Sequence, residues 1–138
     1  MEAISHAGRT VTLAIPAKPD YVVLARLALS AVCRMSPLAP EEVADLKLAI
    51  TEASNYLMGG ERRQSAREGG EADGDGTIMF KFDLGDDSLE LCVSGAEMPT
   101  VSAEERELSI ALIKATVDSY EYDDGTMRLT KQLSYDAQ

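Results

Sequence analysis

Hydrophobic and polar positions alternate along this chain with two periodicities, one typical of strands and one typical of helices. Residues 9–15 place an apolar side chain at every second position (Val11, Leu13, Ile15), which predicts a strand with one buried face. Residues 77–84 and 88–94 repeat this rhythm on either side of a short polar turn. Residues 120–122 and 126–133 do so across the turn "DDG". Each pair therefore predicts an antiparallel hairpin, with Ile78, Phe80 and Phe82 or their neighbours facing the core.

The first helical rhythm follows the segment "PAKPD", whose prolines end the strand before a helix begins near Pro19 or Asp20. Apolar residues then recur every four positions as far as Met35. A stripe of this kind normally faces the core of a small protein. We expect the buried side of this helix to consist of Val23, Leu24, Leu27, Ala28, Ala31 and Met35.

Two further segments have helical spacing. One begins at Pro40, followed by two acids that favour a helix N-terminus, and its predicted buried stripe is Val43, Leu46, Ile50, Ala53 and Leu57. The other begins near Ser102, which can form a capping box with Glu105. Its predicted buried side is Leu108, Ala111, Leu112, Ala115 and Val117.

The predicted order is strand, helix, helix, strand, strand, helix, strand, strand, without the regular strand-helix-strand repetition of a doubly wound fold. We therefore predict one α+β domain over residues 1–138. It is a two-layer sandwich with three helices on one face of a mostly antiparallel mixed sheet. Residues 59–76 are rich in glycine and charge and hold no aliphatic side chain larger than alanine, so we expect a mobile acidic loop there.

Composition narrows the functional classes. Twenty-four acidic residues stand against 13 basic ones, a formal net charge of −11, which argues against direct nucleic-acid binding. A basic protein partner would complement this charge, although solubility alone would also account for it. No apolar run is long enough to span a membrane, and the N-terminus lacks a secretory pattern, so we expect a cytoplasmic protein.

The two cysteines, Cys33 and Cys92, match neither a disulfide framework nor the spacing of a zinc site. We expect both to be small buried apolar residues, and we predict no metal site.

Three stretches, "IPAKPDYVVLARLALSAV", "EEVADLKLAITEA" and "GTMRLTKQL", occur in an order that resembles the anti-sigma regulatory factors of the RsbW and SpoIIAB type. The resemblance runs from about Thr10 to Leu133. It implies the histidine-kinase-like ATPase (GHKL) fold, a homodimer, and binding of a sigma factor that is thereby kept from RNA polymerase. It also implies release by an anti-anti-sigma partner of the STAS type. Kinase-competent members of the family use ATP to phosphorylate a serine of that antagonist.

The resemblance also assigns candidate site residues. Glu52 stands where the family has its catalytic glutamate, and a carboxylate on a solvated helix face is the alternative reading. Tyr56 stands at the position of the magnesium-binding asparagine, and Asn55 is displaced from it by one residue, so only a bulge in the helix would restore an amide there. Gly95 stands where an aspartate would accept from adenine.

The phosphate-binding glycines and the lid over the nucleotide are also altered. The acids Glu104, Glu105 and Glu107 stand where phosphates would approach, and the segment 96–105 is shorter than the family's lid. We therefore expect no Mg-ATP cofactor and read Glu52 as a vestige of a catalytic site.

A partner surface remains. Arg26 stands where the family presents an arginine to both the sigma factor and its antagonist, and Ser30 and Arg34 follow along the same side of the helix. The leading hypothesis is an anti-sigma factor that works by partner exchange without catalysis. The alternatives are an active ATP-dependent serine-protein kinase and a scaffold whose remodelled cavity senses another ligand.

Overall fold

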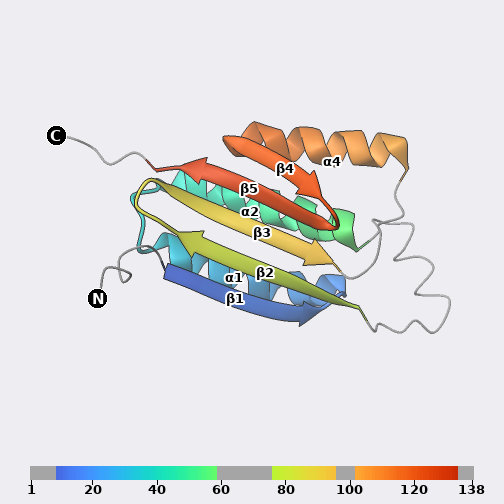
Figure 1. Cartoon of the computed structure of the whole chain (residues 1–138), viewed down its shortest axis with the longest axis horizontal. Helices are drawn as coiled ribbons and strands as arrows, with labels where there is room; N and C mark the ends of the chain where they lie inside the picture. Colours follow the sequence, from blue (N-terminus) through green and yellow to red (C-terminus); the bar gives the residue numbers. More distant parts are fainter. Residues whose placement is uncertain (1–8, 59–75, 96–101, 134–138) are drawn as a thin grey trace.

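A computed structural model describes residues 9–58, 76–95 and 102–133 of the chain (Figure 1). In these residues the elements follow in the predicted order. They are β1 (Arg9–Pro16), the 3-10 turn η2 (Pro19–Tyr21), α1 (Val22–Cys33), α2 (Pro40–Leu57), β2 (Thr77–Leu84), β3 (Ser88–Gly95), α4 (Ala103–Thr116), β4 (Ser119–Asp123) and β5 (Thr126–Gln132). The predicted mobile loop at 59–76 lies outside the described residues except for Gly76, and so does most of the short segment 96–105.

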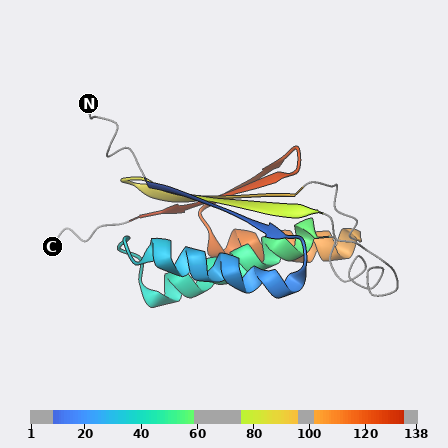
Figure 2. The same cartoon turned by 90° about the horizontal axis from the view of Figure 1, so that it is seen from below.

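The strands form one sheet in the order β1-β2-β3-β5-β4, and the three helices of the described chain all lie on one face of it (Figure 2). This confirms the α+β two-layer class. All four pairings between the described strands are antiparallel, so the parallel pairing that a mixed sheet would contain is not found among them. The turn between β4 and β5 places Asp124 and Gly125 at positive φ, as a tight hairpin turn requires.

The core lies between the sheet and the helices. Ile78, Phe80 and Phe82 of β2 point into it as predicted, since all three are buried. Leu46, Ile50, Ala53 and Leu57 of α2 are also buried and confirm the predicted stripe, with Val43 packed at its edge. On α2 the spacing of apolar residues identifies the buried side because the opposite side is mostly polar, although Leu48 there is 42% exposed.

The prediction for α1 was wrong about which side is buried. The buried residues are Val22, Ala25, Leu29, Val32 and Cys33. Most of the predicted stripe faces solvent instead, with Val23 49%, Leu24 43%, Leu27 60% and Met35 50% exposed, and Ala31 exposed as well. Of the predicted residues, Ala28 alone is partly buried and packs against the core. The cause is that α1 is apolar nearly all round, so the sequence offers two helical stripes and packing against the sheet selects one. We call Val23, Leu24, Leu27, Ala31 and Met35 the outer stripe.

The prediction for α4 was correct at its start and wrong along its length. Ser102 and Glu105 form the predicted capping box: the Glu105 N–H donates to the Ser102 hydroxyl at 3.0 Å. The buried residues, however, are Ile113 and Thr116, whereas Leu108 is 62% exposed. Of the other predicted residues, Ala111 and Ala115 are exposed, and Leu112 and Val117 are partly buried. The reason is that α4 lies against α2 with a polar side chain, Ser109, on the contact side.

Candidate functional site

Glu52 is held between two helices. It lies on α2 and is partly buried, and the Ser109 hydroxyl of α4 donates a hydrogen bond to its Oε1 at 3.2 Å. The carboxylate is therefore neither a freely solvated side chain nor a group standing alone in a cavity. It remains able to accept a further hydrogen bond, because a carboxylate has several acceptor positions.

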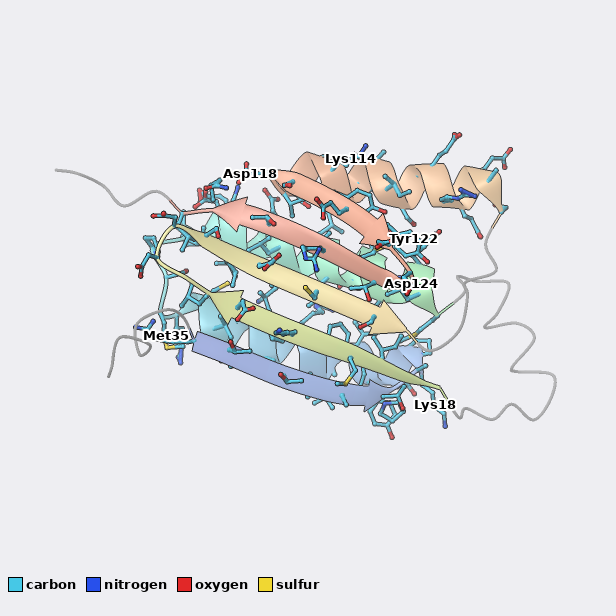
Figure 3. All side chains as sticks on the ribbon, in the orientation of Figure 1. Lys18, Met35, Lys114, Asp118, Tyr122 and Asp124 are labelled. Atoms are coloured by element: carbon cyan, nitrogen blue, oxygen red, sulfur yellow. The ribbon has the colours of Figure 1, made fainter. Side chains whose placement is uncertain are left out.

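Tyr56, which the resemblance assigns to the position of a metal-binding amide, packs into the protein. Its side chain is 7% exposed and lies edge-on to Tyr122 of β4, with ring centroids 5.9 Å apart and ring planes at 89°. This is a favourable aromatic geometry. Figure 3 shows Tyr122 on β4, at the end of the sheet near Asp124. The Tyr56 ring thus has a packing role against the sheet.

Asn55 does not replace the missing amide. Its side chain is exposed, while Tyr56 next to it is buried. The helix α2 is a regular α-helix from Pro40 to Leu57, without the bulge that would bring residue 55 into the position of residue 56. Asn55 and Tyr56 therefore point in different directions around α2, as the rotation of about 100° per residue requires.

The tyrosines around this position form an uncharged aromatic cluster. Burial raises the pKa of Tyr120 and of Tyr122 above the usual value; nearby Tyr56 adds to the effect and Arg106 opposes it. Lys114 lies 5.9 Å from the centre of the Tyr120 ring, within reach of a cation–π contact. The hydroxyls of Tyr120 and Tyr122 therefore stay protonated at neutral pH and supply no negative charge for a metal ion.

Gly95, which the resemblance assigns to the position of an adenine-binding aspartate, ends β3 close to other elements. Its N–H donates to the carbonyl oxygen of Gly125 at 3.2 Å. A Cβ at this position would lie 3.5 Å from Leu57 Cβ and 3.7 Å from Ile78 Cδ1, which is ordinary contact distance.

The acids at the start of α4 lie in and just beyond its first turn. Glu105 accepts a hydrogen bond from the Ser102 N–H at 3.3 Å, so this carboxylate serves the helix itself. Glu104 and Glu107 are exposed. The N-terminus of α4 is therefore already capped by its own side chains and surrounded by negative charge, which disfavours an approaching phosphate.

The predicted partner residues lie on α1 and directly after it. Arg26 and Arg34 are exposed and Ser30 is partly buried. Within the described part of the chain, neither arginine takes part in an ion pair. Ser30 and Arg34 line an open groove between α1 and α2, whereas Arg26 does not. Sequence reasoning missed the outer stripe beside these residues, although a helix that is apolar on all sides in so small a protein was the signal for it.

The cysteines differ from each other. Cys33 is buried, as predicted, and burial raises its pKa to about 11, with Lys47 acting in the opposite direction. Cys92 is only partly buried, because it points to the outer face of the sheet, where it is in register with Arg128. The expectation that Cys92 belongs to the core was therefore wrong.

The residues that the structure describes contain no cluster of three or more histidine, cysteine or acidic side chains that could hold a metal ion. Among their helices, none combines the length and the apolar character needed to cross a membrane.

Comparison with known proteins gives a consistent picture. The model of the histidine kinase-like ATPase domain family matches residues 15–132. The serine-protein kinase RsbW of Listeria innocua serovar 6a is 34% identical over 84 residues, which are 61% of this chain and 48% of that protein. The serine-protein kinase RsbW of Bacillus pumilus is 36% identical over a segment of the same length, again 61% of this chain and 48% of the relative. The chain thus spans about half the length of the curated relatives that it matches.

Proposed function

Because this chain belongs to the histidine kinase-like ATPase domain family, we propose that it is an anti-sigma factor of the RsbW type. In this proposal it binds a sigma factor, keeps it from RNA polymerase, and releases it to a STAS-type anti-anti-sigma protein. The observation that carries the proposal is the outer stripe of α1, where four large apolar side chains are 43–60% exposed. Contiguous exposed apolar surface of this kind is typical of protein interfaces.

Arg26 supports the same surface. It lies on α1, is exposed, and has no ion-pair partner within the described residues. An arginine next to apolar side chains is a frequent anchor in protein interfaces, because its planar group forms forked hydrogen bonds with a carboxylate while its stem covers apolar area. In this proposal Arg26 engages the sigma factor and the antagonist in turn.

We further propose that the chain works without catalysis and without Mg-ATP. Three observations support this: Tyr56 is buried against Tyr122, Asn55 points to solvent, and Gly95 offers no side-chain acceptor. Release of the sigma factor would then follow from competition, set by the relative affinities and concentrations of the two partners. Glu52 in this view has a structural role, tying α2 to α4 through Ser109.

An active serine-protein kinase is the second candidate function. The names of the relatives favour it, and so does Glu52, which keeps the position and partial burial of a functional carboxylate. Partner binding is common to both candidates, whereas binding of Mg-ATP belongs to the kinase alone. The two are therefore separated by nucleotide binding.

The proposal is tested by co-purification. We expect the tagged chain to retain one of the sigma factors encoded in the same genome, and a STAS protein to displace it. Arg26→Ala and Leu27→Asp should abolish retention while leaving the thermal unfolding midpoint close to that of the wild type, because both side chains are exposed. Lys81→Ala, on the outer face of the sheet, is the matched control and should bind normally.

Failure of every sigma factor and every STAS protein to bind would refute the proposal, and so would binding that Arg26→Ala and Leu27→Asp leave unchanged. The homodimer is a prediction of the family resemblance. It is checked by light scattering during gel filtration, where a dimer gives twice the mass of the chain.

A further inference from the structure

An open groove of about 530 Å³ lies where the end of α1 meets the start of α2. We call it the α1–α2 groove. The lining residues that matter for its chemistry are Ser30, Arg34, Ser36, Leu38, Val43 and Lys47. Two of these are cationic and two are aliphatic, so the groove combines positive charge with apolar surface.

The groove is separate from the positions discussed for nucleotide. It is formed by the first half of α2, from Pro40 to Lys47, on the side that faces α1. Glu52 lies further along α2 and bonds to α4 instead. The directions of residues five positions apart differ by about 140° around a helix, so Lys47 lies on the side of α2 that faces α1 and Glu52 on the side that faces α4. Figure 1 shows α2 running between these two regions.

The edge of the groove is fixed by the connection between the helices. The Ser36 hydroxyl donates to the Cys33 carbonyl oxygen at 2.8 Å and accepts from the Leu38 N–H at 3.3 Å. At the start of α2, the Ala39 N–H donates to Glu42 Oε1 at 2.9 Å. Because these bonds hold the connection in place, the groove is formed before any ligand arrives, and less ordering entropy is lost on binding.

The positive charge in the groove is not neutralised by the protein. In the described chain neither Arg34 nor Lys47 belongs to an ion pair, while Lys81, Arg128 and Lys131 each have a carboxylate partner. This is notable in a chain with a net charge of −11. Two unpaired cations beside aliphatic side chains are complementary to carboxylates that flank an apolar group.

The shape of the site favours a macromolecule over a small molecule. Small-molecule sites enclose most of their ligand, whereas this groove is open. It is also continuous with the outer stripe. Arg34, which lines the groove, directly follows α1, and if the helix is extended by one residue the directions of Arg34 and Leu27 around its axis differ by about 20°. A partner that covers the outer stripe would reach the groove with its neighbouring residues.

We infer that the α1–α2 groove docks an acidic segment of a protein partner, in which one or two carboxylates lie beside an aliphatic side chain. The carboxylates bond to Arg34 and Lys47, and the aliphatic side chain packs on Leu38 and Val43. The inference deepens the proposed function, on which it rests for the statement that the ligand is a protein.

The test is a selection of 12-residue peptides from a random displayed library on the purified full chain. We expect the selected peptides to be enriched in aspartate or glutamate next to leucine, isoleucine or valine. Their affinity should fall about tenfold with Arg34→Glu and again with Lys47→Glu, and it should weaken as salt rises. Lys81→Glu, outside the groove, is the matched control and should leave affinity unchanged.

Selection of peptides without acidic residues, or of peptides that bind both groove variants as tightly as the wild type, would overturn the inference. Equal competition by free glutamate would overturn it as well, because the groove would then be a site for small anions. The proposed function is judged separately. If both groove variants still bind the sigma factor, the inference about the groove is rejected and the proposed function stands. If peptides bind in the groove but no sigma factor binds the chain, the anti-sigma role is rejected and the inference about the groove stands.

Discussion

Tyr56 and Asn55 are neighbours in the sequence, yet α2 sends their side chains in different directions. Tyr56 is buried and contacts Tyr122, whereas Asn55 faces solvent. In a chain that used magnesium here, an amide oxygen would have to occupy the buried direction. Tyr56 instead places an aromatic ring in that direction, where it packs against Tyr122.

This packing role predicts a large difference between two adjacent substitutions. Tyr56→Ala should lower the free energy of unfolding by about 3 kcal/mol, because it removes a buried aromatic side chain and leaves a cavity. Asn55→Ala, in the same helix, should change it by less than about 0.5 kcal/mol. Urea denaturation followed by circular dichroism measures both. A small effect at Tyr56 would mean that its ring is not packed and that the position is open to a ligand.

The raised pKa of Cys33 predicts how the free energy of unfolding changes at alkaline pH. Burial raises its pKa from 9.0 to about 11 in the folded chain. A group with a raised folded-state pKa contributes stability that is complete below the unfolded-state pKa and is lost as pH rises through the folded value. Cys33→Ala should therefore flatten the decline in unfolding free energy between pH 9 and pH 11 relative to the wild type.

Denaturation curves at several pH values check this, and the raised pKa values of Tyr120 and Tyr122 act equally in both proteins. Identical slopes for wild type and variant would show that the Cys33 thiol titrates as it does in the unfolded chain.

At the scale of elements, α1 shows why a helical pattern does not always identify the buried side. Both the stripe that starts at Val22 and the stripe that starts at Val23 have helical spacing, and both are apolar. Only the sheet beneath the helix selects between them. The apolar side chains left outside are then available to a partner.

Two leucines of α1 test this assignment directly. Leu29 is 0% exposed and Leu27 is 60% exposed. Leu29→Ala should cost about 3 kcal/mol of unfolding free energy, whereas Leu27→Ala should cost less than about 0.5 kcal/mol. Thermal or urea denaturation distinguishes them. Comparable losses at both positions would indicate that the outer stripe is covered, for instance by a second copy of the chain.

The sequence predicted elements best where local chemistry is decisive. The hairpins follow from polar turns such as "DDG", the start of α4 from the Ser102–Glu105 capping box, and the buried side of α2 from a polar opposite face. The buried side of α4 was missed because its contact with α2 includes the polar pair Ser109 and Glu52. The spacing of apolar residues does not predict a contact that polar side chains make between two helices.

The candidate site was predictable only as a set of positions. The resemblance located Glu52, Tyr56 and Gly95, but what surrounds them comes from residues far away in the sequence. Tyr122 covers Tyr56, Ser109 binds Glu52, and Ile78 approaches Gly95. The α1–α2 groove was not predicted either, since its charge depends on two helices lying side by side.

At the scale of the whole molecule, α2 separates two regions. On one side lie α1, the outer stripe and the α1–α2 groove; on the other lie α4 and the positions that correspond to nucleotide binding. Because all three helices of the described chain share one face of the sheet (Figure 2), these regions are parts of one packed layer. Loss of nucleotide chemistry on the α4 side would leave the partner surface on the α1 side intact.

Calorimetric titration with Mg-ATP tests whether this chain binds proteins without using a nucleotide. A serine-protein kinase RsbW relative serves as the positive control. The account predicts no heat of binding for this chain up to about 1 mM Mg-ATP, the upper end of ordinary substrate affinities. Saturable, magnesium-dependent binding in the micromolar range would overturn it and favour the kinase.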